Sequence, residues 1–514
     1  MQQTQIFDPL VAFDLPKRTR TRAVATIIAL GMAGLLIAFT IFSGDYRLPI
    51  YVIGGVAFLG LLGTAPYAWR HPAYLPFAAA LVYLITMLSP LTDTLRAGVH
   101  YSCLALFALP LVPRLRQTGL LNKGGFRLYC GFFLWAGLTC LYSLAPVFSI
   151  ARLTAAALGF AMALVAIMGV ESDSDVHELI YHFYLACALF VGISLASFAL
   201  PHSLVWQTPM DSLSPDQAAA IALQQPDALN QLVQGDIDRF RGLFGNPNAI
   251  GELMIATVAS GLLCWPRLKR LQKSLCAMVL AAALAMAALA DSRSALLAMM
   301  IGVALYVYWR YRALGLIGLC TALAAVGAVA IARGGLSEYV SRGLGTLTGR
   351  TDIWSYAIGR IAERPILGYG YQVSGAIFAS RFFPIWYGPW DMGPHSSLHD
   401  GYIACAVGVG VPATLLWLFL TLRPWVSLFR ASADPWNLKR IALLVVLPAL
   451  VYNITEATLV DFYGLLAFLF GLCWALAEKY RLRALAADRA AEQATFESLP
   501  AAAQALQAAA WTRT

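Results

Sequence analysis

Long apolar segments, each about as long as a helix that crosses a bilayer, recur along almost the whole chain. They lie at 23–43, 49–69, 73–89, 99–113, 128–145, 151–170, 178–200, 248–265, 274–290, 294–309, 313–332, 399–421, 441–455 and 461–477. This pattern predicts an all-α integral membrane protein with about 12–14 transmembrane helices. The first segment is followed by "SGDYRLP" rather than by a small-residue cleavage site, so we expect it to remain as an anchor.

Polar stretches divide this pattern into spanning regions, loops and tails. We expect an N-terminal tail at 1–22, spanning regions at 23–200, 248–332 and 399–477, two long outer loops at 201–247 and 333–398, and a C-terminal tail at 478–514. The tail after about 484 is rich in alanine, which is typical of a short helix or of disorder. The long loops are the places where the chain has room for a sizeable site outside the membrane.

Each long loop contains a predicted helix. In the first loop, the spacing of Ala, Leu and Gln predicts a helix around 215–233. In the second, Thr351 and Asp352 can cap a helix over about 352–363, which Pro365 then ends. The segment "RFFPIWYGPWDMGP" follows, and its aromatic residues suit either an interfacial belt or a wall that stacks on sugar rings.

The composition agrees with a membrane protein. Hydrophobic residues make up 60% of the chain and charged residues 12%, about half the charged fraction of an average soluble domain. The 9 cysteines all fall within the apolar segments, so we expect buried free thiols rather than a framework of disulfides.

The formal net charge of +9 comes from basic residues in short loops, where membrane orientation explains them better than nucleic-acid binding. With the N-terminus inside, every lysine lies on the cytoplasmic side and both termini are cytoplasmic. The outer side keeps arginines, among them Arg152, Arg239, Arg241, Arg293, Arg333, Arg342, Arg350, Arg360, Arg364 and Arg381. Arginine suits a bidentate grip on phosphate oxygens, so an anionic phosphate ligand is one explanation. The alternative is pairing with Asp236, Asp238, Asp291, Glu338, Asp352 and Glu363.

Several outer-face motifs carry possible chemistry. Arg239 lies in "RFRGLFGNPN" and Arg293 in "ADSRSALL", each at the mouth of a predicted span, where an arginine is more often an anchor than a ligand. Arg350 in "GRTDIW" lies just before a predicted helix N-terminus, which itself favours an anion. Arg350 and that helix turn are therefore expected to share one phosphate.

Two histidines four residues apart precede the span that begins near 399. His395, His399 and Asp391 have the spacing of one helical face, but Gly393 and Pro394 argue against a helix there and hence against a metal site. A histidine at the membrane interface without a chemical role is a second interpretation. We favour a general base for a sugar hydroxyl, because the ordinary pKa of histidine lies near neutral pH.

At these residues the chain resembles a known family. The stretches "RFRGLFGNPNAIG", "ADSRSALL", "LTGRTDIWSYAIGRIAERPILGYGY" and "SSLHDGYIACAVGVGVPATLLW", in this order, resemble the O-antigen ligase/polymerase family of bacterial membrane glycosyltransferases. The motifs cover roughly residues 239–415, and the aromatic residues between the Gly-Tyr turn and His399 look closer to the exopolysaccharide-polymerase branch.

The resemblance implies a site at the periplasmic face of the inner membrane. It implies catalytic roles for Arg239 and Arg350, as pyrophosphate clamps, and for His399, which activates a hydroxyl. Supporting contacts to substrate are expected from Arg241, Arg293, His395, Asp400 and Tyr402; Asp400 stands where the family commonly has asparagine. No cofactor and no metal are implied.

The implied substrate is a glycan linked to undecaprenyl pyrophosphate, and the reaction is an inverting displacement that either polymerises repeat units or ligates a finished chain to the lipid A core. Membrane lipid, a chain-length regulator and a flippase of the same pathway are the implied partners, and nucleic acid is not. A rival interpretation is a flippase or transporter. That rival predicts charged residues deep within the spans, whereas the middle of nearly every predicted span carries none.

Overall fold

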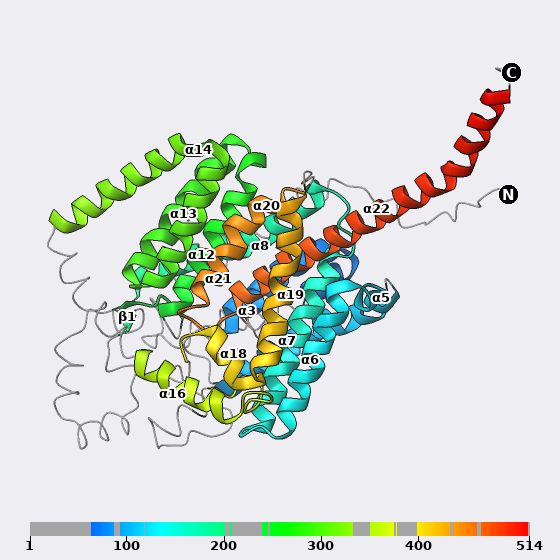
Figure 1. Ribbon diagram of the computed structural model, residues 1–514. Coiled ribbons are helices and arrows are strands. Elements are labelled where there is room, and N and C mark those ends of the chain that lie inside the picture. Colours follow the sequence, from blue (N-terminus) through cyan, green and yellow to red (C-terminus); the bar gives the residue numbers. More distant parts are fainter. Residues whose placement is uncertain are drawn as a thin grey trace.

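The computed structural model describes residues 63–86, 93–117, 119–200, 206–207, 239–244, 247–332, 350–374, 377, 398–431, 434, 436–459 and 464–511. The helices form one bundle, in which α16, α18 and β1 lie at one end and α20 lies at the other (Figure 1). The α-helices are α3 Leu75–Thr86, α4 Asp93–Ala108, α5 Val112–Gln117, α6 Gly124–Leu141, α7 Pro146–Ile167, α8 Asp173–Ala196, α12 Pro247–Cys264, α13 Arg270–Leu289, α14 Arg293–Ala332, α16 Arg350–Glu363, α18 Gly401–Val409, α19 Val411–Arg430, α20 Leu438–Ile441, α21 Leu447–Tyr452 and α22 Leu465–Trp511.

Shorter elements connect these helices. They are the 3₁₀ turns η1 Pro72–Tyr74, η2 Leu109–Leu111, η3 Leu120–Asn122, η4 Ser197–Ala199 and η6 Trp265–Arg267, the π-helical turn η9 Ala442–Val446, and the strands β1 Trp206–Gln207 and β2 Arg239–Phe240. The two strands pair antiparallel, with Trp206 opposite Phe240. This small ribbon fixes the backbone of Arg239 beside the bundle.

The fold confirms the predicted all-α membrane class. Six of the described helices are long and apolar enough to cross a membrane: Pro146–Ile167, Asp173–Ala199, Pro247–Arg267, Arg270–Leu289, Arg293–Arg312 and Val411–Arg430. Each overlaps a segment that hydropathy predicts as a span. The predicted helix over 352–363 is also present, as α16, and it ends two residues before Pro365. The segments 23–43, 215–233 and 381–394 lie outside the described residues.

Three regions differ from the predicted spans. The segment 399–421 is two helices, because Gly410 adopts a left-handed backbone with φ 83° between α18 and α19. The segment predicted at 441–455 is helical over 438–452 instead, through α20, η9 and α21, and it includes a π-helical turn. The last span and the C-terminal tail form one continuous helix, α22, which leaves the bundle toward the C-terminus (Figure 1).

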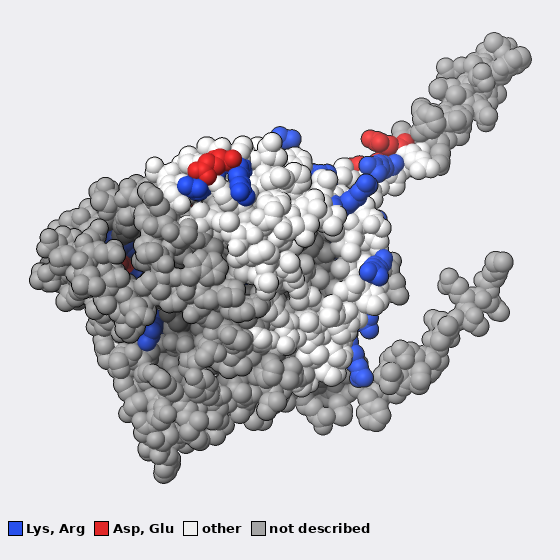
Figure 2. All heavy atoms as spheres, turned by 90° about the horizontal axis from the view of Figure 1, so that it is seen from below, with Lys and Arg blue, Asp and Glu red and all other residues white. Residues whose placement is uncertain are grey.

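The core forms around α12 and the first part of α22. Helix α12 packs against α8, α13, α14 and α22, and the α22 side chains from Leu465 to Ala477 are almost fully buried. On the outside, Leu134, Leu141 and Leu271 are each more than 70% exposed. Seen from below, the described surface carries charged side chains in a few separate groups with wide uncharged areas between them (Figure 2). An exposed apolar surface of this kind suits contact with lipid.

A glycine turn ties α16 to the break between α18 and α19. The amide of Gly370 donates to the carbonyl of Gly408 at 2.9 Å, and the amide of Val411 donates to the carbonyl of Pro365 at 2.8 Å. Gly368 has φ 66°, and a Cβ atom there would lie 2.4 Å from the Gly408 carbonyl oxygen. This close backbone contact holds α16 beside the start of α18, where His399 lies.

Candidate functional site

His399 lies at the entrance of α18 and faces a carboxylate from a distant part of the chain. Its Nδ1 atom is 3.1 Å from Oε2 of Glu456, in the turn that follows α21. The histidine side chain is 25% exposed and that of Glu456 only 9%, so the imidazole is partly accessible and the carboxylate beside it is buried. His399 also has φ 49°, a left-handed conformation that is uncommon for a side-chain-bearing residue and typical of functional sites.

Glu456 extends the contact to the first turn of α12. The Nδ2 atom of Asn248 donates to Oε1 of Glu456 at 3.1 Å. The hydroxyl of Tyr452 donates to the Asn248 carbonyl at 3.3 Å, which helps to place this turn against α21. Both oxygens of a buried carboxylate therefore have hydrogen-bond partners, as a stable buried charge requires.

Arg239 joins the same network from β2. Its Nη2 atom donates to Oδ1 of Asn248 at 3.1 Å, and its Nε atom donates to the carbonyl of Ala290 at 2.9 Å. The Nη1 atom has no hydrogen-bond partner among the residues that the structure describes. A chain of hydrogen bonds thus runs from Arg239 through Asn248 and Glu456 to His399.

Arg239 keeps its charge in this position. Burial lowers the pKa of its guanidinium, while the nearby carboxylates of Asp291 and Glu456 act to raise it. Arginine does not lose its proton in proteins, so the group stays cationic and partly desolvated. A cation held in this way attracts an anion more strongly than one in water.

Arg293 lies next to this network but is paired. Its Nε and Nη2 atoms donate to the two carboxylate oxygens of Asp291, at 3.0 Å and 3.1 Å. Arg360 likewise pairs with Glu363 at 2.7 Å. The pairing alternative therefore describes these two arginines, whereas the hydrogen bonds of Arg239 go to a carbonyl and an amide oxygen.

The N-terminus of α16 lies near His399. The indole of Trp354, one helical turn after the first residue of α16, donates to the carbonyl of Leu398 at 3.0 Å. Arg350 begins α16, so the backbone of the predicted clamp lies at this end of the bundle. The Arg350 side chain and the whole of His395 lie outside the part of the chain that the structure describes.

The remaining predicted site residues are engaged with backbone. Oδ1 of Asp400 accepts from the amides of Tyr402 and Ile403, both at 2.8 Å, so this carboxylate caps α18. The hydroxyl of Tyr402 donates to the carbonyl of Leu450 at 2.9 Å. Arg241 is half-buried, and its carbonyl accepts from the amide of Phe244 in the turn after β2.

Part of the chain matches a known protein family. Residues 253–418 match the family described as O-antigen ligase. This match covers less than half of the chain, and it supports an assignment to the O-antigen ligase/polymerase family. No curated protein matches the chain.

The match to the O-antigen ligase family and the six apolar helices support a multi-pass bacterial membrane protein of the membrane glycosyltransferase type, and this family type implies a lipid-linked glycan as substrate. The matched stretch includes Arg293, Arg350 and His399. Arg239, Asn248 and Glu456 lie outside it, and the fold brings them to the same place.

Glu456 is the site residue that sequence reasoning missed. The signal for it is a single carboxylate within the apolar stretch "VYNITEATL", close to the end of a weak predicted span. For metal binding, the described residues contain no group of three or more His, Cys, Asp or Glu side chains that can hold an ion.

Proposed function

We propose that this protein polymerises lipid-linked repeat units at the periplasmic face of the inner membrane. In this proposal the donor is a glycan on undecaprenyl pyrophosphate, and the acceptor is a sugar hydroxyl of the next lipid-linked unit. The observation that carries the proposal is the hydrogen-bonded chain of Arg239, Asn248, Glu456 and His399.

The acid–base part of the reaction belongs to His399. When Nδ1–H donates to Glu456, Nε2 is left with its lone pair and can accept a proton. The acceptor oxygen attacks the anomeric carbon as its proton moves to Nε2. The bond from that carbon to the phosphate oxygen breaks, and the electron pair leaves with the pyrophosphate. A single displacement of this kind inverts the configuration at the anomeric carbon.

The charge that develops on the pyrophosphate needs fixed donors. Arg239 is a half-buried cation whose Nη1 group has no partner among the described residues, and Arg350 stands at the N-terminus of α16, where backbone amides favour an anion. Two arginines and a helix N-terminus supply this stabilisation, so the proposed step requires no metal.

Ligation of a finished glycan to the lipid A core is the second candidate. The description of the matched family favours it, because that description names O-antigen ligase. Both reactions use the same donor chemistry and differ in the acceptor. A chain-length regulator and a flippase of the same pathway are the proposed partners in either case.

The test is the size profile of lipid-linked and surface glycan in cells that lack the protein and are complemented with variants. Polymerase function predicts that His399→Ala and Arg350→Ala accumulate single lipid-linked repeat units. Ligase function predicts long lipid-linked chains that are missing from the lipid A core. Arg430→Ala, which changes an exposed arginine at the other end of the bundle, is the matched control and should restore the wild-type profile. A wild-type profile from His399→Ala would rule out the proposed base.

A further inference from the structure

A cavity of about 360 Å³ lies at the far end of α12 from the candidate site. The first turns of α8, the C-terminal end of α12, the η6 turn and the segment from Trp436 to Ile441 line it. Asn248 of the site and Leu263 of the cavity are separated by most of α12, about 22 Å at the helical rise per residue. The cavity is therefore separate from the glycan site, and charge places its end of the bundle in the cytoplasm.

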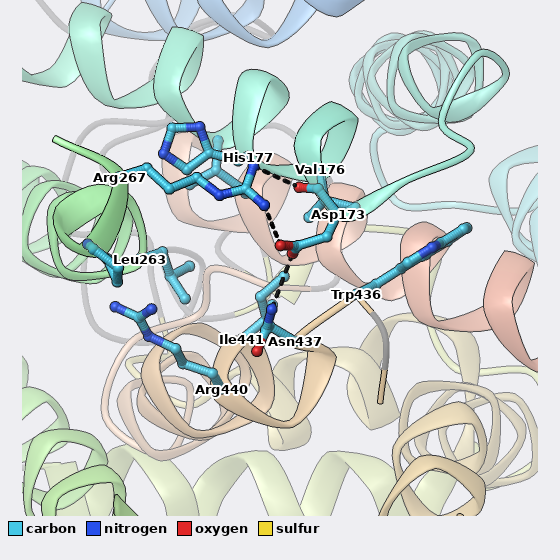
Figure 3. A pocket seen from close by; sticks show the side chains of 11 residues that line it. Asp173, Val176, His177, Leu263, Arg267, Trp436, Asn437, Arg440 and Ile441 are labelled. Atoms are coloured by element: carbon cyan, nitrogen blue, oxygen red, sulfur yellow. Dashed lines mark hydrogen bonds and ion pairs between the residues drawn. The ribbon is translucent and has the colours of Figure 1, made fainter. Parts of the chain in front are cut away.

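Three polar side chains with no net charge form one wall of the cavity. Arg267 forms an ion pair with Asp173, and Asn437 donates to the other oxygen of the same carboxylate at 3.1 Å. Figure 3 shows these side chains joined by dashed lines. The negative charge of Asp173 is thus already matched by Arg267 and does not oppose an incoming anion.

Arg440 supplies a second positive charge on the opposite wall. Its Nη2 atom donates to the carbonyl of Leu262, and its guanidinium lies over the Tyr306 ring at 5.3 Å from the centroid. Its Nε atom is buried and has no hydrogen-bond partner among the described residues. In Figure 3 the Arg440 side chain extends beside Leu263, apart from the Asp173 group. Buried N–H donors nearly always have a hydrogen-bond partner, so the Arg440 guanidinium has the features of a group that binds an anion.

The rest of the lining is apolar. Val176, Ile180, Leu263 and Trp436 border the same space, and Arg483 of α22 stacks on the Trp436 ring at 5.3 Å from the centroid. A cavity with a net positive charge on one side and apolar walls on the other matches a ligand with a phosphate and a greasy remainder. Basic pockets between helices on the cytoplasmic side bind lipid head groups in this manner.

We propose that this cavity binds the phosphate group of an anionic glycerophospholipid from the cytoplasmic leaflet, with Arg440 as the principal ligand. The chemistry that is recognised is a phosphate oxyanion. Arg267 provides a second guanidinium at the same cavity, and the lipid chains extend along the apolar walls. The ligand would hold α8, α12 and the start of α20 together at the end opposite the glycan site.

The experiment uses full-length protein, purified in detergent and freed of lipid, and follows the melting temperature during titration with phosphatidylglycerol or with inorganic phosphate. Phosphatidylglycerol should stabilise the wild type in a saturable way. Arg440→Gln should bind about tenfold more weakly, since it removes a charge-assisted hydrogen bond. Arg430→Gln, which removes an exposed arginine at the same end of the bundle, is the matched control and should bind as the wild type does.

The two titrations distinguish the source of the phosphate. Stabilisation by the lipid alone assigns a lipid site, and equal stabilisation by inorganic phosphate assigns free phosphate to the same cation. Arg267→Gln is the second variant, because the Arg267 side chain is 38% exposed and its replacement is compatible with folding. That change removes the cationic partner of Asp173, leaves a net negative charge at this wall and should also weaken binding of the lipid. Unchanged lipid affinity in both Arg440→Gln and Arg267→Gln would overturn the proposal.

Discussion

Glu456 contacts the His399 ring and helps to orient it. In Glu456→Gln the side chain keeps its size but loses the negative charge that stabilises a protonated imidazole. One carboxylate oxygen is also replaced by an NH2 group, which then faces a hydrogen-bond donor of His399 or Asn248. We expect turnover to fall about 100-fold while KM changes little, because substrate contacts remain in place. Steady-state rates of glycan transfer in reconstituted membranes give kcat and KM separately.

The control for this prediction is Glu492→Gln, which makes the same chemical change at an exposed position of α22. It should leave both constants unchanged. Glu456→Asp should recover part of the lost turnover, because the charge is restored at a shorter reach. A loss in Glu456→Gln that appears in KM alone would assign Glu456 to substrate binding and remove it from the positioning of His399.

Individual residues also show how much of the candidate site the sequence can predict. Arg239 and His399 stand out in the sequence because each is a polar residue at the mouth of an apolar segment. Glu456 lies 57 residues after His399 and inside an apolar stretch, and it meets the histidine because the turn after α21 lies against the start of α18, where the amide of Gly401 donates to the carbonyl of Asn453. Pattern and spacing carry no information about that contact, so it had to come from the fold.

Among the elements, the glycine turn after α16 is tightly constrained. Gly368→Ala places a methyl group 2.4 Å from the Gly408 carbonyl oxygen and forces alanine into a left-handed backbone. The backbone term alone costs about 1–2 kcal/mol, and the clash adds to it. We expect a lower melting temperature and reduced transfer activity, measured on the purified protein in detergent.

Gly359→Ala is the matched control on the neighbouring helix. A Cβ atom there has no other atom within 4 Å, and alanine is favoured over glycine in a helix by about 1 kcal/mol. This variant should melt at the wild-type temperature or above it. Equal destabilisation by both substitutions would mean that the contact between Gly368 and Gly408 does not hold α16 in place.

The helices also show where hydropathy does not predict the observed elements. Long apolar runs predict α7, α8, α12 and α13 well, because length and composition decide a span. The run from 399 to 421 is equally apolar, yet Gly410 divides it. The break arises because the carbonyl of Ile366 lies against Gly410, where a Cβ atom would come within 2.0 Å. Such a contact depends on a segment from another loop, which hydropathy does not detect.

For the whole molecule, α22 ties separate helices together at the end of the bundle opposite the glycan site. The Glu478 side chain accepts from the amide of Gly125 at 2.6 Å, at the start of α6. The Lys479 ammonium donates to the carbonyls of Ile167, Met168 and Val170, each at 2.8 Å, at the end of α7. Burial lowers the pKa of Lys479 to about 8, so the amine still carries its proton at pH 7.

Lys479→Met removes the cap from α7 and keeps the length of the side chain. Charge-assisted hydrogen bonds contribute about 1.5–3 kcal/mol each at most, and some of the loss is recovered by apolar packing. We expect the melting temperature at pH 7 to fall by several degrees. Lys273→Met, a half-exposed lysine on α13, should cause little change. A wild-type melting temperature for Lys479→Met would show that α22 adds nothing to the stability of the bundle.

The orientation of the protein in the membrane decides whether the proposed site can reach its glycan substrate. Helix α12 carries Asn248 of the proposed glycan site at its start and lines the proposed phosphate cavity at its end, and it is long and apolar enough to cross a membrane, so we expect the two to face opposite sides. All lysines lie on the cavity side in the predicted topology, which places that side in the cytoplasm. We therefore expect the proposed glycan site to face the periplasm.

Cysteine labelling of whole cells tests this orientation. Gly359→Cys on α16 and Glu492→Cys on α22 place exposed thiols at opposite ends, and most of the described native cysteines are buried. A membrane-impermeant maleimide should label Gly359→Cys in intact cells and Glu492→Cys after the cells are opened. The wild-type protein measures the background from native thiols. The reverse pattern would put His399 in the cytoplasm, away from the periplasmic glycan, and the proposed reaction would then lack access to its substrate.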